Sequence, residues 1–283
     1  MGLPIARNLA AAGYEVAGFD LDPSRVALLE GAAFARDDAD LVLCSLPSPD
    51  AVEEVARAVL AAGRPGVFVD MSTSPPALAR RLAAELAEAG IAALDAPVSG
   101  GPMGAESATL TVMAGGDAAA FERARPVLAA VGSLVVHVGG PGAGQAAKLC
   151  NNLVAGATMA ALAEACALAE AEGIDAATLY ALLTASTGDS RVLRNRFPLA
   201  GAERAHPASR AFEPLFALDL MVKDLGLALA AAAERGLDAE VAKAALERYR
   251  AAQEAGHGAL DYSAVFLAVT LGAWSASSAS GKA

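Results

Sequence analysis

The sequence predicts a doubly wound α/β domain over residues 1–144, followed by an all-α domain over 145–283. Two observations support this prediction. In the first half, continuous apolar runs alternate with stretches of helical spacing, which is typical of a parallel sheet covered by helices. After Gly144 the helical spacing continues, but strand-like runs no longer occur. A long helix that begins at this point would join the two domains.

Each predicted strand is an apolar run bounded by glycine, proline or polar residues. In chain order the strands are 14–20, 40–47, 66–72, 90–98, 109–116 and 133–140. The stretch 48–63 has Ser48 near its start and Gly63 at its end, which are the positions that helix caps prefer. The stretch 74–90 has two prolines in its first turn, which also predicts a helix.

The second half consists of stretches in which apolar residues recur at helical spacing. They are 144–173, 175–185, 213–235, 239–255 and 262–274. The stretch 186–211 lies between them and is rich in arginine and proline, so it predicts an irregular segment.

Composition argues against several classes of protein. The formal net charge is −11 and no basic run occurs, so nucleic-acid binding is not expected. No charge-free stretch of about twenty apolar residues appears, so no membrane span is expected. Cys44, Cys150 and Cys166 lie among apolar residues without metal-ligand spacing, and predict buried free thiols in the reducing cytoplasm. The three histidines are scattered, so no metal site is expected.

The opening segment matches the end of a dinucleotide-binding fingerprint. In a Rossmann-like domain, G-x-G-x-x-G joins the first strand to the first helix, and an acidic residue follows about twenty residues later. Gly2, the helical stretch 3–12, the strand-like stretch 16–19 and Asp20 follow in that order. Gly2 is therefore predicted to be the third glycine, with a helix cap as the alternative. The first strand and its two glycines would precede Met1.

An absent first strand would leave a gap in the sheet. In this fold that strand lies between the strands expected at 15–19 and 41–46. Neighbouring strands lie about 4.8 Å apart, so these two strands would be too far apart to hydrogen-bond. We therefore expect a chain that starts at Met1 to be less stable than one extended upstream, and to bind a dinucleotide weakly.

The most distinctive stretch is DAPVSGGPMGAESATLTVMAGG, over residues 95–116. It leaves a strand at Asp95 and enters a loop that contains Ser99, Gly100 and Gly101. Backbone N–H groups and a hydroxyl in such a loop can converge on an anion such as a substrate carboxylate. An ordinary glycine-rich turn is the alternative.

This stretch resembles the signature of the β-hydroxyacid dehydrogenases, a family that includes 3-hydroxyisobutyrate dehydrogenase. Other stretches of the chain are also similar to motifs of that family. They are Leu46–Pro47, DMST over 70–73, GAGQAAKLCNN over 142–152, and Lys223–Asp224–Leu225. The resemblance runs from Met1 to about Trp274. One departure is Ala108, where the family usually has glycine.

The resemblance implies a role for several side chains. Lys148 would exchange the proton of the substrate hydroxyl, with a pKa lowered by partial burial near a cationic nicotinamide. Asn152 is four residues further on, so it would lie on the same helix face and hydrogen-bond the same oxygen. Ser99, Gly100 and Gly101 would hold the carboxylate. The alternative for Lys148 is a lysine at the helix surface.

The cofactor that the resemblance implies is NAD. Its site would be lined by Gly2, Asp20, Leu46, Pro47, Thr73 and Lys223. Asp20 can accept both ribose hydroxyls and would repel the 2′-phosphate of NADP, although Arg25 nearby leaves NADP possible. Lys223 would close over the cofactor from the helical domain. The alternative for Lys223 is a solvated lysine paired with Asp219 or Glu234.

The predicted activity is hydride transfer between NAD and a small β-hydroxyacid or its semialdehyde. One alternative is an imine-reductase-like enzyme that uses NADP, which Lys148 and Asp20 argue against. Another is a truncated chain that keeps the fold but binds little cofactor and has no activity.

The substrate's side group is expected to meet the stretch 186–211. Three arginines within six residues of this stretch, Arg191, Arg194 and Arg196, would either select a polar or acidic substrate or form a solvated loop at a dimer contact. The substrates considered are 3-hydroxyisobutyrate, a tartronate-semialdehyde-type hydroxyacid and a 4-hydroxybutyrate-type acid. The apolar helices of the second half predict a homodimer or homotetramer formed through that half.

Overall fold

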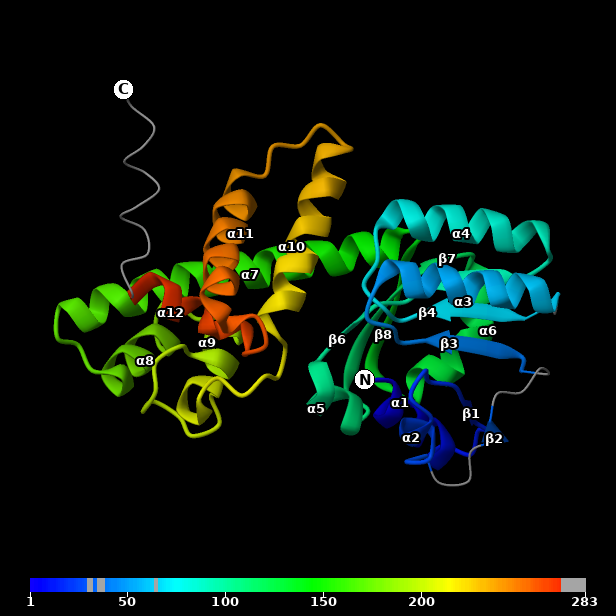
Figure 1. Cartoon of the computed structure of the whole chain (residues 1–283), viewed down its shortest axis with the longest axis horizontal. Coiled ribbons are helices and arrows are strands. Elements are labelled where there is room, and N and C mark those ends of the chain that lie inside the picture. The colour runs from blue at the N-terminus through cyan, green and yellow to red at the C-terminus, as the bar shows by residue number, and fades with distance from the viewer. Residues whose placement is uncertain (30–32, 35–38, 64–65, 271–283) are drawn as a thin grey trace. The chain divides into compact units, whose positions relative to one another are not determined.

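The computed structural model describes residues 1–29, 33–34, 39–63 and 66–270 (Figure 1). The chain divides into two compact units, Met1–Leu149 and Cys150–Ala283. The division therefore falls later than the boundary expected at residue 144. The end of the last predicted helix, 271–274, lies outside the described residues.

The first unit alternates strands and helices, as the sequence predicts. Its strands are β1 (Ala17–Gly18), β2 (Ala33–Phe34), β3 (Leu41–Cys44), β4 (Val67–Asp70), β5 (Ala92–Asp95), β6 (Val98–Ser99), β7 (Leu110–Gly116) and β8 (Gly132–Gly139). Its helices are α1 (Gly2–Ala11), α2 (Pro23–Val26), α3 (Pro49–Ala62), α4 (Pro76–Glu88), α5 (Gly101–Glu106) and α6 (Ala118–Ala129). The strand predicted at 14–20 is only the two residues of β1, and the strand predicted at 90–98 is divided into β5 and β6.

Six of the strands form one mixed sheet. Its order is β3-β4-β5-β7-β6, and β8 also pairs with β7. The strands β3, β4 and β5 are parallel, whereas β7 runs antiparallel to β5 and β6. The predicted parallel pairing is present for β3, β4 and β5 and between β7 and β8, whereas β7 runs antiparallel to β5 and β6, because an apolar run reports burial and not strand direction.

The strand β8 also differs from its prediction. Most of its residues are exposed or half-buried, including Leu134, Val136 and Val138 at 53%, 41% and 43% exposure. Its continuous apolar sequence had predicted burial on both faces. An edge strand with β7 as its partner can leave one face open, which the composition of the strand does not reveal.

Strands β1 and β3 do not hydrogen-bond to one another among the described residues. Strand β1 pairs only with β2 in a separate two-stranded sheet, and β3 lies at the end of the six-stranded sheet. No strand lies between β1 and β3 among the described residues.

Helices cover both faces of the six-stranded sheet (Figure 1). On one face Phe68 of β4 packs with residues of α3 and α4, including Val52 and Leu82. On the other face Val69 packs with residues of α1 and α6. As the sequence predicts, Ser48 caps α3 by accepting the Ala51 N–H at 3.3 Å, and Gly63 ends the helix at φ 64°.

The second unit is helical, as predicted. Its elements are α7 (Ala143–Ala171), α8 (Ala176–Thr184), α9 (Arg191–Arg196), η1 (Pro207–Arg210), α10 (Leu218–Ala233), α11 (Glu240–Ala252), η2 (Gln253–His257), η3 (Tyr262–Ala264) and α12 (Val265–Thr270). The first seven residues of α7, Ala143–Leu149, belong to the first unit. The stretch 186–211 is more ordered than expected, because it contains α9 and the short helix η1.

A buried carboxylate organises the connections of the helical unit. Asp261 Oδ2 accepts the N–H groups of Leu215 and Phe216 at 3.1 Å and pairs with Arg196 at 3.3 Å. Its Oδ1 accepts the Ser263 hydroxyl at 2.8 Å. The carboxylate therefore fixes the chain that enters α10, and each of its oxygens has partners, as a buried charge requires.

In the described part of the chain, α7 is long and apolar enough to cross a membrane by length and composition alone. The core helix of a soluble protein passes the same test. Met159, Ala163 and Cys166 of α7 are fully buried in the core of the helical unit, so packing explains its apolar residues.

The three cysteines are free thiols. Cys44 and Cys166 are buried as expected, and burial raises the pKa of each thiol to about 12. Cys150 is exposed, so its predicted burial is wrong. It lies on the exposed side of α7, next to residues that face the core.

Candidate active site

The loops after β3 and β4 lie together at one edge of the sheet. These strands are parallel and in register, with Cys44 opposite Asp70. Two residues further on, the Leu46 N–H donates to the Ser72 hydroxyl at 2.9 Å. Leu46 and Thr73 are half-buried there, and Pro47 is exposed. The carboxyl ends of parallel strands are where dinucleotides bind in such sheets, so the three residues expected to contact NAD suit that ligand.

Asp20 follows β1 and is half-buried. One carboxylate oxygen accepts the Asp22 N–H at 2.9 Å, and the other lies 4.0 Å from the guanidinium of Arg25. Asp20 can still accept ribose hydroxyls, but a cation next to it keeps NADP a possible cofactor. Leu21 is 91% exposed, so the position that follows Asp20 is open to a larger side chain.

Gly2 begins α1 near the end of β3. A Cβ at this position would lie 3.8 Å from the Ser45 Cβ, which is an ordinary contact. Packing within the described residues therefore does not require glycine at position 2. Its expected role as the third fingerprint glycine stays a prediction.

The loop expected to hold a carboxylate connects β6 to α5. Ser99 is half-buried and Gly100 is exposed. Gly100 and Gly101 have φ values of 133° and 63°, which side chains adopt rarely. A Cβ at Gly100 would also approach Leu110 Cδ2 to 3.1 Å. The glycines are therefore needed by the backbone of the loop.

Ala108 departs from the family pattern and adopts φ 53°. This left-handed conformation costs an alanine about 1 kcal/mol more than a glycine. The glycine that is usual at this position is thus explained by the backbone conformation before β7, and Ala108 forms the turn under mild strain.

The start of α7 lies against the strands of the first unit. A Cβ at Gly144 would collide with the carbonyl oxygens of Met113 and Asp95, and one at Gly142 would lie 2.7 Å from the Pro76 oxygen. Gly142 also has φ 83°. The two glycines before Lys148 are therefore required by close packing of the helix start.

Asp95, at the end of β5, caps this helix. Its Oδ1 accepts the Gly142 N–H at 2.8 Å and its Oδ2 accepts the Gln145 N–H at 2.7 Å. Burial raises the pKa of the Asp95 carboxyl, and these N–H groups oppose the rise. A carboxylate at the positive end of a helix is favoured electrostatically.

Asp70, at the end of β4, is a second buried carboxyl. Its Oδ1 accepts the Ser72 N–H at 2.8 Å, and its Oδ2 accepts the Ser74 hydroxyl at 3.3 Å. Burial raises the pKa of Asp70 to about 6, the hydrogen bonds from Ser72 and Ser74 oppose the rise, and the charge of Asp95 adds to it.

Lys148 and Asn152 are both buried on α7, at 7% and 5% exposure. The alternative of a lysine at the helix surface is therefore wrong for Lys148. Asn152 donates to Asp224 Oδ2 at 2.5 Å, and its own oxygen accepts the side-chain amide of Asn151 at 2.9 Å. These contacts fix which atom of the Asn152 amide is the donor, and one N–H of its NH₂ group is not used by Asp224.

Lys223 lies beside Asp224, and its Nζ is 3.2 Å from Asp224 Oδ1. Asp224 is therefore a partner of Lys223 that the sequence did not suggest. The two atoms attract as an ion pair although they do not meet hydrogen-bond geometry. Asp224 is 1% exposed and links Asn152 with Lys223, two residues that the sequence assigned to substrate and cofactor.

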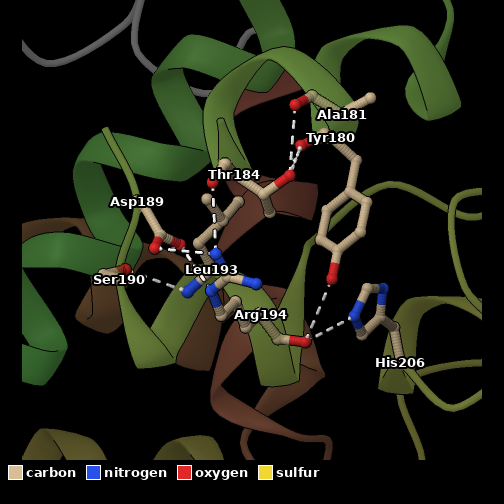
Figure 2. Close-up of polar contacts among 8 residues, drawn as sticks. All are labelled: Tyr180, Ala181, Thr184, Asp189, Ser190, Leu193, Arg194 and His206. Atoms are coloured by element: carbon tan, nitrogen blue, oxygen red, sulfur yellow. Dashed lines mark hydrogen bonds and ion pairs between the residues drawn. The ribbon is translucent and has the colours of Figure 1, made fainter. Parts of the chain in front are cut away.

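Two of the arginines singled out in the stretch 186–211 have structural partners, and Figure 2 shows those of Arg194. Arg194 pairs with Asp189 at 2.8 Å and donates to the Thr184 carbonyl at 3.1 Å. Arg196 pairs with Asp261 and lies 5.1 Å from the ring centre of Tyr262. Selection of an acidic substrate by these two arginines therefore has no support, because their guanidinium groups are engaged in folding the segment.

Figure 2 also shows Tyr180 and His206 converging on the main chain of α9. The His206 ring donates from Nε2 to the Arg194 carbonyl at 2.9 Å, and the Tyr180 hydroxyl lies 3.5 Å from the same oxygen. Tyr180 of α8 and His206, which directly precedes η1, thus provide hydrogen-bond partners for the Arg194 carbonyl of α9. In the described part of the chain, no group of three His, Cys, Asp or Glu side chains is placed to hold a metal ion.

Two family models together match most of the chain. The NAD binding domain of 6-phosphogluconate dehydrogenase matches residues 1–139, and the model for NAD-binding of NADP-dependent 3-hydroxyisobutyrate dehydrogenase matches residues 142–269. Fold and site together define an NAD(P)-dependent oxidoreductase with a Rossmann-like domain followed by a helical domain.

Individual relatives narrow this class. A probable 3-hydroxyisobutyrate dehydrogenase from Mycobacterium bovis is 42% identical, over 94% of this chain and 93% of that protein. An NAD-dependent L-serine dehydrogenase from Pseudomonas aeruginosa is 41% identical, with the same two shares. The solved Mycobacterium tuberculosis 3-hydroxyisobutyrate dehydrogenase with L-serine has a TM-score of 0.89 at 40% identity, over 95% of each chain. The chain belongs to the β-hydroxyacid dehydrogenase family.

Solved imine reductases are more distant. One from Pseudomonas sp. has a TM-score of 0.61 at 23% identity, over 95% of this chain and 96% of that chain. Such a likeness shows the fold alone, so the imine-reductase alternative gains nothing beyond the fold.

Sequence reasoning missed the buried polar residues that surround the start of α7. They are Asp70, Ser72, Ser74, Asp95 and Gln145. Two signals were available, because Asp70 and Asp95 each end an apolar strand, and Gln145 stands between the paired glycines and Lys148. Neither signal identifies the partners, which come from separate segments.

The raised pKa of Asp70 predicts a pH effect on stability. The carboxyl binds its proton more tightly in the folded chain, at about 6, than at its ordinary value of 3.8. Its contribution to the free energy of unfolding is fully present below about pH 4 and is lost as pH rises through 6. We expect Asp70→Asn to remove about 2–3 kcal/mol of this pH dependence. Urea unfolding at a series of pH values measures it, with the exposed Asp50→Asn as control. Equal pH dependence in wild type and Asp70→Asn would contradict this account.

Proposed function

We propose that the enzyme oxidises a small β-hydroxyacid to the corresponding semialdehyde with NAD, and catalyses the reverse reduction. The observation that carries the proposal is the pair Lys148 and Asn152, buried four residues apart on α7 within a motif of the family. A lysine and an amide four residues apart lie on one helix face, so both can bind one substrate oxygen.

Lys148 is the proton-exchanging group in this proposal. In the oxidation, the neutral Lys148 amine takes the proton of the substrate hydroxyl while the hydride leaves the carbon that bears this hydroxyl. NAD, when bound, accepts that hydride. In the reduction, the Lys148 ammonium returns the proton to the carbonyl oxygen as negative charge develops there. A base requires the neutral form of this amine.

The remaining residues hold the reactants. Ser99, Gly100 and Gly101 would bind the carboxylate with a hydroxyl and backbone N–H groups. The unused N–H of Asn152 would bind the substrate oxygen beside Lys148. This division leaves the carbon that bears the hydroxyl free to face the cofactor.

The cofactor would lie along the carboxyl ends of β1, β3 and β4. Asp20 would accept the ribose hydroxyls, and Leu46, Pro47 and Thr73 would line the path between the adenosine and the nicotinamide. Lys223 would also contact the cofactor. NAD is preferred because Asp20 would repel a 2′-phosphate, and Arg25 is the nearest group that would weaken this preference.

The proposed substrate class is a short acid with a hydroxyl on its β-carbon. The names of two relatives support this class, since 3-hydroxyisobutyrate and L-serine share the β-hydroxyl and the carboxylate. Arg194 and Arg196 are engaged within the helical unit, so they do not support a substrate with a second acidic group.

The proposed assembly is a homodimer or homotetramer formed through the helical unit. On α7, Val154 and Leu168 are 63% and 64% exposed, and fourteen residues bring a helix back to nearly the same side. A symmetric contact between copies would cover such a stripe. We also propose that the enzyme works in the cytoplasm, where its free thiols stay reduced.

Loss of the proton-exchanging group should abolish most turnover. We expect Lys148→Ala to lower kcat by roughly a hundred- to ten-thousand-fold while NAD still binds. Steady-state kinetics with 3-hydroxyisobutyrate and L-serine, together with calorimetry for NAD, measure both effects. The matched control is Lys243→Ala, whose lysine is exposed and pairs with Asp238 and Glu240. Near-normal kcat in Lys148→Ala would remove Lys148 from the mechanism.

Cofactor preference should follow the charge at the end of β1. We expect Asp20→Asn combined with Leu21→Arg to shift the ratio of kcat/KM for NADP over NAD upward by at least roughly tenfold, because a repulsion is removed and a phosphate partner is added. Asp22→Asn is the control, since it removes a neighbouring carboxylate of the same charge. An unchanged ratio in the double variant would show that Asp20 does not distinguish the ribose of NAD from the 2′-phosphorylated ribose of NADP.

Assembly should depend on the exposed stripe of α7. We expect Leu168→Glu to reduce the molar mass measured by light scattering at micromolar concentration, because a charge would be buried between copies. Leu237→Glu, at a residue 65% exposed and outside the stripe, should leave the molar mass unchanged. A monomeric wild-type protein would contradict the proposed assembly.

A further inference from the structure

The side chain of Gln145 lies at the centre of a buried polar cluster in the first unit. Gln145 is completely buried in the first turn of α7. Its Oε1 accepts the Ser74 N–H at 2.9 Å, and its Nε2 donates to the Ser72 carbonyl at 2.9 Å. The orientation of the amide is unambiguous, because a backbone N–H can only donate and a carbonyl can only accept.

These two contacts enclose Thr73. The carbonyl before Thr73 and the N–H after it both bind the same side-chain amide, as a neighbouring strand would bind them. The main chain at Thr73 therefore cannot move away from the first turn of α7 without breaking both bonds. Thr73 is one of the residues expected to contact NAD.

The cluster extends to the second cofactor loop. The hydroxyl of Ser72 accepts the Leu46 N–H at 2.9 Å. Gln145 Nε2 also lies 3.3 Å from Asp70 Oδ2, which accepts the Ser74 hydroxyl. Leu46 and Thr73 are thus held by one set of hydrogen bonds that ends on Gln145.

The same residue is fixed to β5 through its main chain. The Gln145 N–H donates to Asp95 Oδ2, so the helix turn is held from the sheet as well. Lys148 follows three residues later, which is less than one helical turn. A helix is stiff over this distance, so the position of Gln145 sets the position of the Lys148 backbone.

We propose that Gln145 is a positioning residue, which sets Lys148 at a fixed distance from the cofactor loops at Leu46 and Thr73. The inference rests on the proposed function of Lys148 and of these loops. In it, Gln145 contacts neither substrate nor cofactor, and it acts on turnover through the geometry between the proton-exchanging amine and the nicotinamide. A misplacement of about 1 Å at a reacting group can lower a rate roughly a hundredfold.

The network makes two variants behave differently. Gln145→Met keeps the size of the side chain and removes its three polar contacts, so we expect kcat to fall roughly a hundredfold. Ser72→Ala removes the acceptor of the Leu46 N–H and the hydroxyl that hydrogen-bonds Asp70, but it leaves both main-chain contacts of the Gln145 amide in place. We therefore expect KM for NAD to rise roughly tenfold with kcat changed by less than about threefold. Tyr249→Phe is the control, because it removes one buried hydrogen bond, to the Gly156 carbonyl at 3.2 Å, in the helical unit. Its kcat and KM should stay at wild-type values.

Gln145→Glu provides a test that a loss of stability cannot imitate. A protonated glutamic acid can donate to the Ser72 carbonyl and accept the Ser74 N–H, as the amide does. An ionised one has no donor, and it faces the Asp70 carboxylate and the Ser72 carbonyl, with Asp95 on its own N–H. We therefore expect kcat of Gln145→Glu relative to wild type to fall roughly tenfold or more from pH 6 to pH 9. The kcat of Gln145→Met relative to wild type should not be higher at pH 6 than at pH 9, so this variant should show no recovery at the lower pH.

Hydrogen exchange of the free enzyme separates this inference from the proposed function. In Gln145→Met the Ser74 amide should exchange faster than in wild type and in Tyr249→Phe, with or without catalytic activity. If wild type oxidises no small β-hydroxyacid with NAD, the proposed function fails whatever the exchange shows. If wild type is active, and folded Gln145→Met keeps wild-type kcat or Gln145→Glu shows no pH-dependent recovery, the positioning role is overturned.

Discussion

The capping of α7 by Asp95 is the interaction on which the rest of the first unit depends. The first N–H groups of a helix have no partner within it, and here they are buried where water cannot reach them. The two oxygens of Asp95 accept the Gly142 and Gln145 N–H groups. These hydrogen bonds offset the free-energy cost of burying the carboxylate and the two N–H groups. The approach is so close that a Cβ at Gly144 would overlap the carbonyl oxygens of β5 and β7. The spacing of the glycine motif is therefore set by the packing of α7 against the sheet. The residues that follow the motif in α7 are consequently held in a fixed position relative to β5 and β7.

The sequence predicted the order of elements well, because local rules govern it. Caps such as Ser48 and Gly63 act within one turn, and apolar runs mark burial wherever the strand lies. Strand direction and exposure depend instead on which neighbour a strand meets. The reversal of β7 and the open face of β8 are of this kind. The arginines of 186–211 show the same limit, since Arg194 and Arg196 have their partners in Asp189 and Asp261 and not in a ligand.

The residues of the candidate site show the same contrast between local sequence patterns and contacts that form only in the fold. The shared helix of Lys148 and Asn152 was predictable because both lie in one motif, and their role in the site stays a prediction. The residues around Gln145 were not, since they come from the ends of β4 and β5 and meet only in the folded sheet. A cluster of this kind is expensive to bury unless every member is satisfied. Within the cluster, Gln145 uses both ends of its amide, and each oxygen of Asp70 and Asp95 accepts at least one hydrogen bond.

The helix α7 contains residues of both units. Lys148 belongs to the first unit, whose strands fix the turn before it. Asn152 belongs to the second unit, where Asp224 orients its amide. One turn further, a Cβ at Gly156 would lie 3.1 Å from Met221 and Leu225, so the helix approaches α10 closely as well. Because the four-residue interval from Lys148 to Asn152 is internal to one helix, its length is set by helix geometry, whatever the arrangement of the two units. A lysine and an amide can therefore be supported by separate cores while their backbone positions keep a constant spacing.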